Sequence, residues 1–250
     1  MGLSDPSETT RGNCMTMLYE AAALFLGIHL LISGTRVRDA ITGAIGEAPY
    51  MGLFSLASIG AIVWLVMSYN TVQKSGADPL LYSFGPGITH MGIPVIAIAF
   101  FLGLQGLLSP NPTSVRQEAT AAKESTITGV LRITRHPFLW GVAIWSAFHL
   151  AANGDQASVV LFGTFFVLSI LGTFSIDAKR RRKMGEAWSA FAAKTSNIPF
   201  GAILSGRTSL RVAEDFGWRF WVTALVFLAV LFSHAHIFGV SPFPGGWVPY

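Results

Sequence analysis

The histidines are the residues of this sequence best suited to chemistry. There are six, and two of them, His29 and His149, lie inside long apolar stretches. An ionisable side chain is costly in hydrocarbon, so a histidine there usually faces the interior of a helix bundle and marks a binding site or a polar path. The alternative is a neutral imidazole that only hydrogen-bonds a neighbouring helix.

The neighbours of His29 suggest what it could bind. On a helix, Phe25 lies one turn before His29, Ser33 one turn after it and Arg36 two turns after it, all on one face. An imidazole between an aromatic ring and a cation suits a ligand that is apolar at one end and anionic at the other.

The neighbours of His149 also favour a site. Trp145 and Asn153 lie four residues before and after it, on the same helical face. That face combines an aromatic wall with a polar group able to orient the ring.

Among metal-dependent chemistries, these residues favour heme over zinc. The sequence has no His-Glu-x-x-His motif and few carboxylates near the apolar stretches, so a hydrolytic zinc site is not expected. A single cysteine, Cys14, excludes a cysteine-rich metal site. Heme iron accepts axial imidazole, and its macrocycle suits an apolar bundle, while its propionates need cations. Candidate cations are Arg36, Arg38, Arg132 and Arg135.

The run Arg135-His136-Pro137 precedes the apolar stretch of His149 and is typical of a helix start. His136 lies 13 residues before His149, about 220° round an ideal helix, so the two rings cannot face one iron on an unbroken helix. The remaining histidines lie at the ends of apolar stretches, where interfacial histidines are common: His90, His234 and His236.

Composition indicates that a membrane positions these residues. Of 250 residues, 52% are apolar and 12% are charged, against about 25% charged in typical globular proteins. We expect an all-α integral membrane protein with about six transmembrane helices, since a span needs about 20 mostly apolar residues. The expected spans lie near 21–35, 49–69, 88–109, 138–152, 157–176 and 220–238. The first is expected to be retained, because no small-residue cleavage site follows it.

Basic residues predict the orientation. With six spans, loops 36–48, 110–137 and 177–217 share one side and carry two, four and eight Lys and Arg. The other side has only Arg11 and Lys74. The positive-inside rule therefore places those loops in the cytoplasm and both termini outside, most simply in a bacterial inner membrane. Because the basic residues flank spans and lack an aromatic binding surface, nucleic acid is not an expected partner.

This topology also sets the depth of the two histidines. His29 is nearer the cytoplasmic side and His149 nearer the external side, so one heme can join them only if helices tilt or boundaries shift. Residues 1–16 and 243–250 are interpreted as tails on either side of a membrane domain, 17–242.

Motifs spread along the chain match one known family. They are His29-Leu-Leu-Ile-Ser33 with Arg38 and Gly46, Arg135-His136-Pro137-Phe138-Leu139-Trp140-Gly141, Trp145-x-x-x-His149-Leu150, Asn153-Gly154-Asp155, Trp188, Phe191, Thr195-Ser196, Pro199-Phe200, His234 and Phe238-Gly239-Val240-Ser241-Pro242. In order and spacing, the sequence resembles the NnrU family over nearly the whole chain after residue 17.

The resemblance implies a heme b protein. The family includes the 15-cis-zeta-carotene isomerases, called Z-ISO, and bacterial members associated with denitrification. By motif, the heme ligands of the isomerases fall on His29 and His149. The expected cofactor-binding residues are His29, His149, Arg36, Arg38, Arg135, His136, Trp145 and Ser146. Because the isomerases have a cysteine where this chain has Ser146, exchange of imidazole for thiolate on oxidation is not expected here.

We therefore expect a cis–trans isomerase of a poly-cis carotene, with His29 and His149 as axial ligands and catalytic residues. A polyene would enter from the lipid, and the iron would lower the barrier to rotation about a cis double bond. The alternative is a non-enzymatic heme protein that binds nitric oxide or supports denitrification, since an apolar heme pocket would serve either. A weaker resemblance is to membrane methyltransferases of the isoprenylcysteine type, but Asp177 stands nearly alone among basic residues where those enzymes have an acidic pair.

Overall fold

The computed structural model describes residues 6–76, 78–114, 117, 120–121, 126–211 and 217–246. In these residues the chain is helical, with one isolated β-bridge between Leu80 and Asp155, which confirms the all-α fold. The elements are α1 (Pro6–Gly27), η1 (Ile28–Ser33), α2 (Arg36–Ile45), α3 (Glu47–Ser75), η2 (Pro86–Met91), α4 (Gly92–Leu108), α5 (Val130–Ile133), α6 (Pro137–Ala152), α7 (Gln156–Met184), α8 (Glu186–Lys194), α9 (Gly201–Leu204), α11 (Gly217–Phe238) and η5 (Pro244–Gly246).

Five helical stretches are long and apolar enough to cross a membrane, and each coincides with an expected span. They are Gly12–Ser33, Glu47–Ser75, Pro86–Leu108, Gln156–Met184 and Gly217–Phe238. The sixth expected span corresponds to α6, whose 16 residues reach about 24 Å, less than a hydrocarbon core of about 30 Å. The chain is therefore a multi-pass membrane protein, while the count of six and the orientation of the termini stay predictions.

The chain divides into two compact units, and α6 and α7 each contribute to both. One unit comprises 1–83 and 149–168, and the other comprises 84–148 and 169–250. His29 and His149 therefore belong to the same unit.

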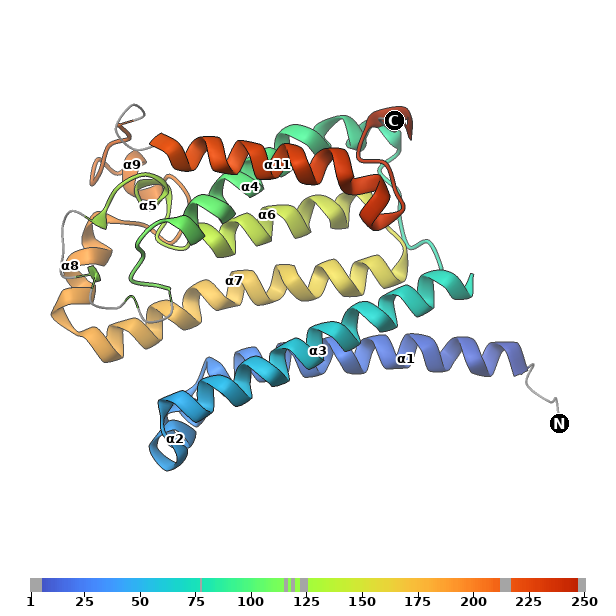
Figure 1. Ribbon diagram of the computed structural model, residues 1–250, viewed down its shortest axis with the longest axis horizontal. Helices are drawn as coiled ribbons and strands as arrows, with labels where there is room; N and C mark the ends of the chain where they lie inside the picture. The colour runs from blue at the N-terminus through green and yellow to red at the C-terminus, as the bar shows by residue number, and fades with distance from the viewer. Residues whose placement is uncertain are drawn as a thin grey trace. The chain divides into compact units, whose positions relative to one another are not determined.

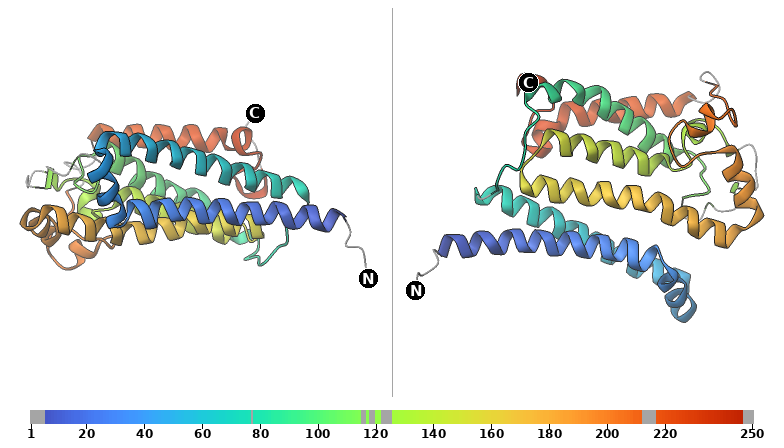
Figure 2. Two further views of the ribbon diagram at one scale, coloured as in Figure 1. Left: turned by 90° about the horizontal axis from the view of Figure 1, so that it is seen from below. Right: turned by 180° about the vertical axis from the view of Figure 1, so that it is seen from behind.

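In the first unit, α1 and α3 lie side by side (Figure 1; Figure 2). Both helices bury small and aliphatic residues, including Ala21 and Leu18 of α1 and Ala61 and Leu65 of α3. Small side chains let helix backbones approach closely inside a membrane. Between these helices α2 turns back onto α3, because Gly46 adopts a φ of +88°, a conformation that residues other than glycine rarely adopt.

The C-terminal end of α6 is fixed in the first unit by the segment that precedes η2. The Leu81 amide donates to the Gly154 carbonyl at 2.8 Å, and the Tyr82 hydroxyl donates to the Leu150 carbonyl at 2.5 Å. A Cβ on Gly154 would collide with the Tyr82 carbonyl, so this close approach requires glycine. These bonds hold the last turn of α6, which begins at His149.

In the second unit, α4 packs against α11 and, at Gly141, against α6 (Figure 1). A Cβ on Gly141 of α6 would lie 2.6 Å from the Ala99 carbonyl oxygen and from the Gly103 nitrogen of α4. The two backbones therefore touch where these helices cross, which glycine at position 141 permits. The rings of Phe100 and Phe227, 5.6 Å apart, join α4 to α11.

Candidate functional site

His29 lies in an irregular helical turn. Helix α1 continues after Gly27 as the π-helix η1, in which backbone hydrogen bonds reach five residues back instead of four. Such π turns are rare overall, and many of those that occur lie at functional sites. The His29 Nδ1 atom donates to the carbonyl oxygen of Phe25 at 2.8 Å, so the ring is anchored to its own helix.

This hydrogen bond determines what the other ring nitrogen of His29 can do. A carbonyl oxygen only accepts, so the proton is on Nδ1 and the neutral ring has its lone pair on Nε2. The Ser58 hydroxyl of α3 lies 3.3 Å from Nε2 and can donate to it. Metal-binding histidines have the same arrangement, with one nitrogen held by a carbonyl and the other presented to the metal.

Aromatic side chains surround the His29 ring. Its centroid lies 4.5 Å from that of Phe25 and 5.3 Å from that of Phe54. Phe25 is the aromatic neighbour expected one turn before His29, whereas Phe54 comes from α3 and could not be paired with His29 from sequence periodicity.

Contacts through α7 link His149 to the same cluster. The His149 ring lies 4.7 Å from that of Phe162, and Phe165, on the next turn of α7, lies 5.7 Å from Phe25. Both expected iron ligands thus contact aromatic side chains that lead to neighbouring positions on α7, His149 through Phe162 and His29 through Phe25 to Phe165. The Asn153 side chain, expected to orient the His149 ring, donates instead to the His149 backbone carbonyl at 2.9 Å and caps α6.

The two expected cations of this unit differ in environment. Arg36 is exposed, whereas Arg38 is only 8% exposed. Arg38 forms an ion pair with Glu47, and its guanidinium carbon lies 5.3 Å from the centroid of the Tyr50 ring. Only Arg38 is thus held in a defined position next to the aromatic side chains.

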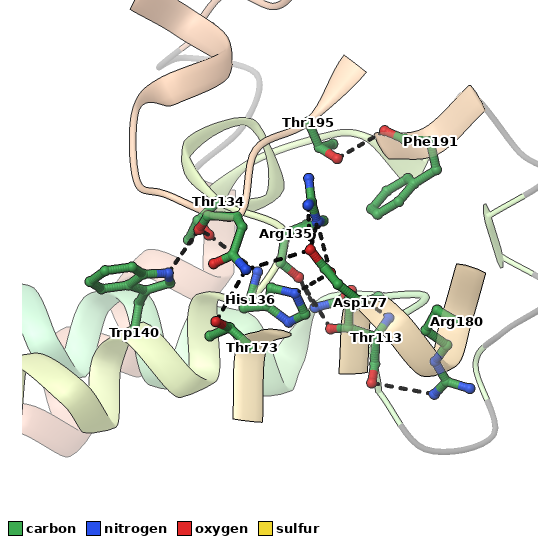
Figure 3. A network of polar contacts seen from close by, with 12 residues as sticks. Thr113, Thr134, Arg135, His136, Trp140, Thr173, Asp177, Arg180, Phe191 and Thr195 are labelled. Atoms are coloured by element: carbon green, nitrogen blue, oxygen red, sulfur yellow. Dashed lines mark hydrogen bonds and ion pairs between the residues drawn. The ribbon is translucent and has the colours of Figure 1, made fainter. Parts of the chain in front are cut away.

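A second polar cluster, around Asp177 of α7, lies in the second unit (Figure 3). The Nε atom of Arg135 donates to both carboxylate oxygens of Asp177, at 2.9 and 3.0 Å. His136, whose side chain is fully buried, donates from Nε2 to the same carboxylate at 2.6 Å. The side-chain amide of Asn197 donates to Thr173 at 3.1 Å and lies 3.5 Å from Asp177. Three polar side chains, those of Arg135, His136 and Asn197, thus share one buried carboxylate.

Further hydrogen bonds tie the start of α6 to the segment after α8. The Arg135 amide donates to the Ser196 carbonyl at 2.8 Å. The Thr134 hydroxyl and the Trp140 indole both donate to the Asn197 carbonyl, at 2.6 and 2.7 Å (Figure 3). The cluster therefore fixes the entry into α6, as the helix-start interpretation of this motif predicted.

Asp177, the carboxylate that stands nearly alone among basic residues in the sequence, has two basic partners from a distant part of the chain. It is the common partner of Arg135 and His136, which precede it by more than 40 residues. Burial lowers the pKa of His136, although the Asp177 carboxylate opposes that shift. Arg135 already has a carboxylate partner, and its assignment to a cofactor, like that of His136, stays a prediction.

The remaining candidates lie on α6 and at helix ends. Trp145 and Ser146 belong to the part of α6 in the second unit, and the fully buried Ser146 hydroxyl donates to the Val142 carbonyl at 2.7 Å. Arg132 donates to the Ser209 carbonyl at 3.1 Å. The end-of-helix histidines are His90 in η2 and His234 and His236 in the last turns of α11.

Several residues of these sites were not among the sequence-based candidates, and three of them illustrate how much signal the sequence carries. Ser58 has a weak signal, a hydroxyl inside an apolar span, while Phe162 is one of many aromatic residues and has none. Asp177 has a stronger signal, because a lone carboxylate where a membrane helix ends needs a partner.

Comparisons with known proteins support the resemblance seen in the motifs. The chloroplastic 15-cis-zeta-carotene isomerase of Zea mays is 25% identical over 198 residues, which are 78% of this chain and 52% of that protein. The enzyme of the same name from Arabidopsis thaliana is 26% identical over 214 residues, 82% of this chain and 56% of that protein. The chain thus spans about half the length of these curated relatives.

No solved structure matches the chain. The profile of one family, described as NnrU protein, matches residues 17–242. That match covers most of the sequence, and the chain therefore belongs to the NnrU family.

Proposed function

We propose that this protein is a heme b-dependent cis–trans isomerase that acts on a poly-cis carotene within the membrane. The names of the two plant relatives support the reaction. The observation that carries the cofactor assignment is the hydrogen bond between His29 Nδ1 and the Phe25 carbonyl, because it leaves the Nε2 lone pair as the donor that heme iron requires.

The residues around His29 and His149 fit a heme. Phe25, Phe54 and Phe162 offer flat apolar surfaces next to the two imidazoles, as a macrocycle needs. His29 and His149 would hold the heme iron through their imidazole nitrogens. When bound, heme supplies an iron that can interact with a conjugated double bond and lower the barrier to its rotation.

The contribution of the chain is to bind, orient and exclude water. Rotation about a double bond adds and removes no atoms, so the site needs no general acid or base beside the substrate. Phe25 and Phe54 provide apolar contacts for a polyene, and the fixed His29 ring prevents the ligand atom from turning away. The substrate is soluble in lipid and would reach the site from the bilayer that surrounds the candidate spans.

The test of this proposal combines a spectrum with an assay. Protein purified in detergent should show a Soret band and a pyridine hemochrome of the b type. Expressed with a poly-cis carotene pathway that lacks its own isomerase, it should convert the 15-cis bond under reducing conditions, as measured by chromatography of the extracted carotenes. Heme-loaded protein that leaves the 15-cis substrate unchanged under those conditions would contradict the isomerase assignment.

A further inference from the structure

Two buried hydrogen-bond donors near His29 have no acceptor. Within the described part of the chain, the Arg38 Nη1 atom and the Tyr50 hydroxyl are enclosed and make no hydrogen bond. The Tyr50 residue is 4% exposed and the Arg38 side chain 10% exposed. Buried donors without acceptors are costly and therefore uncommon, so two in neighbouring residues point to a missing acceptor.

These two residues are connected to the His29 cluster by direct contacts. The Arg38 guanidinium lies over the Tyr50 ring. The Tyr50 ring stacks on Phe54 with 5.8 Å between centroids, and Phe54 in turn contacts His29. A continuous path within the first unit therefore leads from an imidazole, across aromatic rings, to a guanidinium and a hydroxyl.

The local backbone explains why the two donors meet. The Thr35 hydroxyl caps the start of α2 by accepting from the Val37 amide at 3.2 Å. At the other end of α2, the positive φ of Gly46 reverses the chain into α3. Arg38 on α2 is thereby placed over Tyr50, in the first turn of α3.

We propose that Arg38 and Tyr50 together bind a carboxylate of the ligand whose apolar part lies against Phe54 and His29. This inference rests on the proposed function, in which the ligand is heme and the carboxylate is a propionate. A guanidinium and a phenol can both donate to the two oxygens of one carboxylate, and the charges are opposite.

The acidic neighbours of Arg38 do not form a hydrogen bond with its Nη1 atom, which stays available to a ligand. Glu47 binds Nη2 and has a side chain that is 55% exposed, so it occupies the solvent side of the guanidinium. Asp39 lies 3.9 Å from Nη1, too far for a hydrogen bond. Arg36, the other cation of α2, is exposed, so the structure favours Arg38 as the anchor.

The test compares two ligands that differ only in their carboxylates. Full-length protein produced without heme is titrated with hemin and with hemin dimethyl ester, and binding is followed by the Soret absorption. Wild type should bind hemin at least about tenfold more tightly than the ester, as expected for charge-assisted hydrogen bonds. Tyr50→Phe keeps the ring and removes only the hydroxyl, so it should weaken hemin binding several-fold and leave ester binding unchanged. Arg38→Lys should act in the same direction.

Tyr69→Phe is the matched control, because Tyr69 is also on α3 but its hydroxyl already has a partner, Ser158 at 3.2 Å. It should leave both affinities unchanged. Equal binding of hemin and ester by wild type, or equal loss of both ligands in Tyr50→Phe, would overturn the carboxylate anchor and leave the proposed cofactor intact. Failure of wild type to bind hemin at all would overturn both.

Discussion

At the scale of single residues, the feature that matters most is the imidazole of His29. The π turn and the Phe25 carbonyl act together, because one places the ring and the other selects its tautomer. Ser58 approaches the lone pair from α3, so the unliganded ring has a hydrogen bond that a metal would replace. The His149 ring lies against that of Phe162 and belongs to the same unit.

Removal of either imidazole should therefore remove the proposed heme. We expect His29→Ala or His149→Ala to lose heme or to weaken its binding by at least about tenfold, since a lost axial bond is not replaced by solvent in an apolar site. The heme-to-protein ratio of purified samples measures this. His236→Ala, at an exposed position in the last turn of α11, is the control and should keep normal heme content. Unchanged spectra in both core variants would refute the ligand assignment.

If heme binds as proposed, Ser146 should determine which ligands its oxidised iron can have. It lies one turn before His149 on α6, and its neutral hydroxyl is a far poorer iron ligand than a thiolate. Wild type should therefore lack a thiolate signature in electron paramagnetic resonance in every redox state. Ser146→Cys should gain one in the ferric state only, because a metal can ionise a nearby thiol. A thiolate signal in wild type that survives Cys14→Ser would mean that the residue alignment is mistaken.

At the scale of helices, the Asp177 cluster joins the start of α6, the C-terminal half of α7 and the segment after α8. The Arg135 guanidinium also lies 5.7 Å from the centroid of the Trp188 ring of α8. A single carboxylate thus fixes three elements, and its loss leaves a buried cation without a partner.

Asp177→Asn should therefore destabilise the second unit. It keeps the shape of the side chain but removes its charge, and breaking a buried ion pair typically costs about 3–5 kcal/mol. The midpoint of thermal unfolding in detergent should fall by several degrees. Glu186→Gln, at an exposed carboxylate in the first turn of α8, should cost less than about 1 kcal/mol. Equal melting temperatures of the two variants would show that the cluster does not stabilise the fold.

The elements themselves were largely predictable from the sequence, whereas their contacts were not. Apolar runs between charges gave the positions of the candidate spans, because a bilayer imposes length and composition directly. Helical periodicity predicted the contact between Phe25 and His29. It could not predict the contacts with Ser58 and Phe54, because these residues come from another helix. The π turn was equally hidden, since nothing in residues 28–33 marks a change of helical period.

For the whole molecule, α6 decides whether the number of membrane crossings is even or odd, and hence on which side of the membrane the C-terminus lies. The other five helical stretches satisfy the length criterion for a span, and α6 is shorter. If α6 did not cross, α7 would run in the opposite direction and would carry the basic run 179–183 to the external side. The positive-inside rule opposes that arrangement, because most of the basic residues of the chain follow α7 or lie in its last turns.

We therefore expect α6 to cross the membrane, with local thinning of the bilayer compensating for its short length. Reporter fusions measure this at two positions. Alkaline phosphatase joined after Tyr250 should be active, and a reporter that works only in the cytoplasm should be silent there; the same pair joined after Lys194 should give the opposite result. If both positions report the cytoplasm, α11 does not cross. If the C-terminal fusion reports the cytoplasm and the Lys194 fusion reports the outside, then α6 does not cross. The orientation predicted from the 14 to 2 distribution of basic residues in the loops would then be wrong.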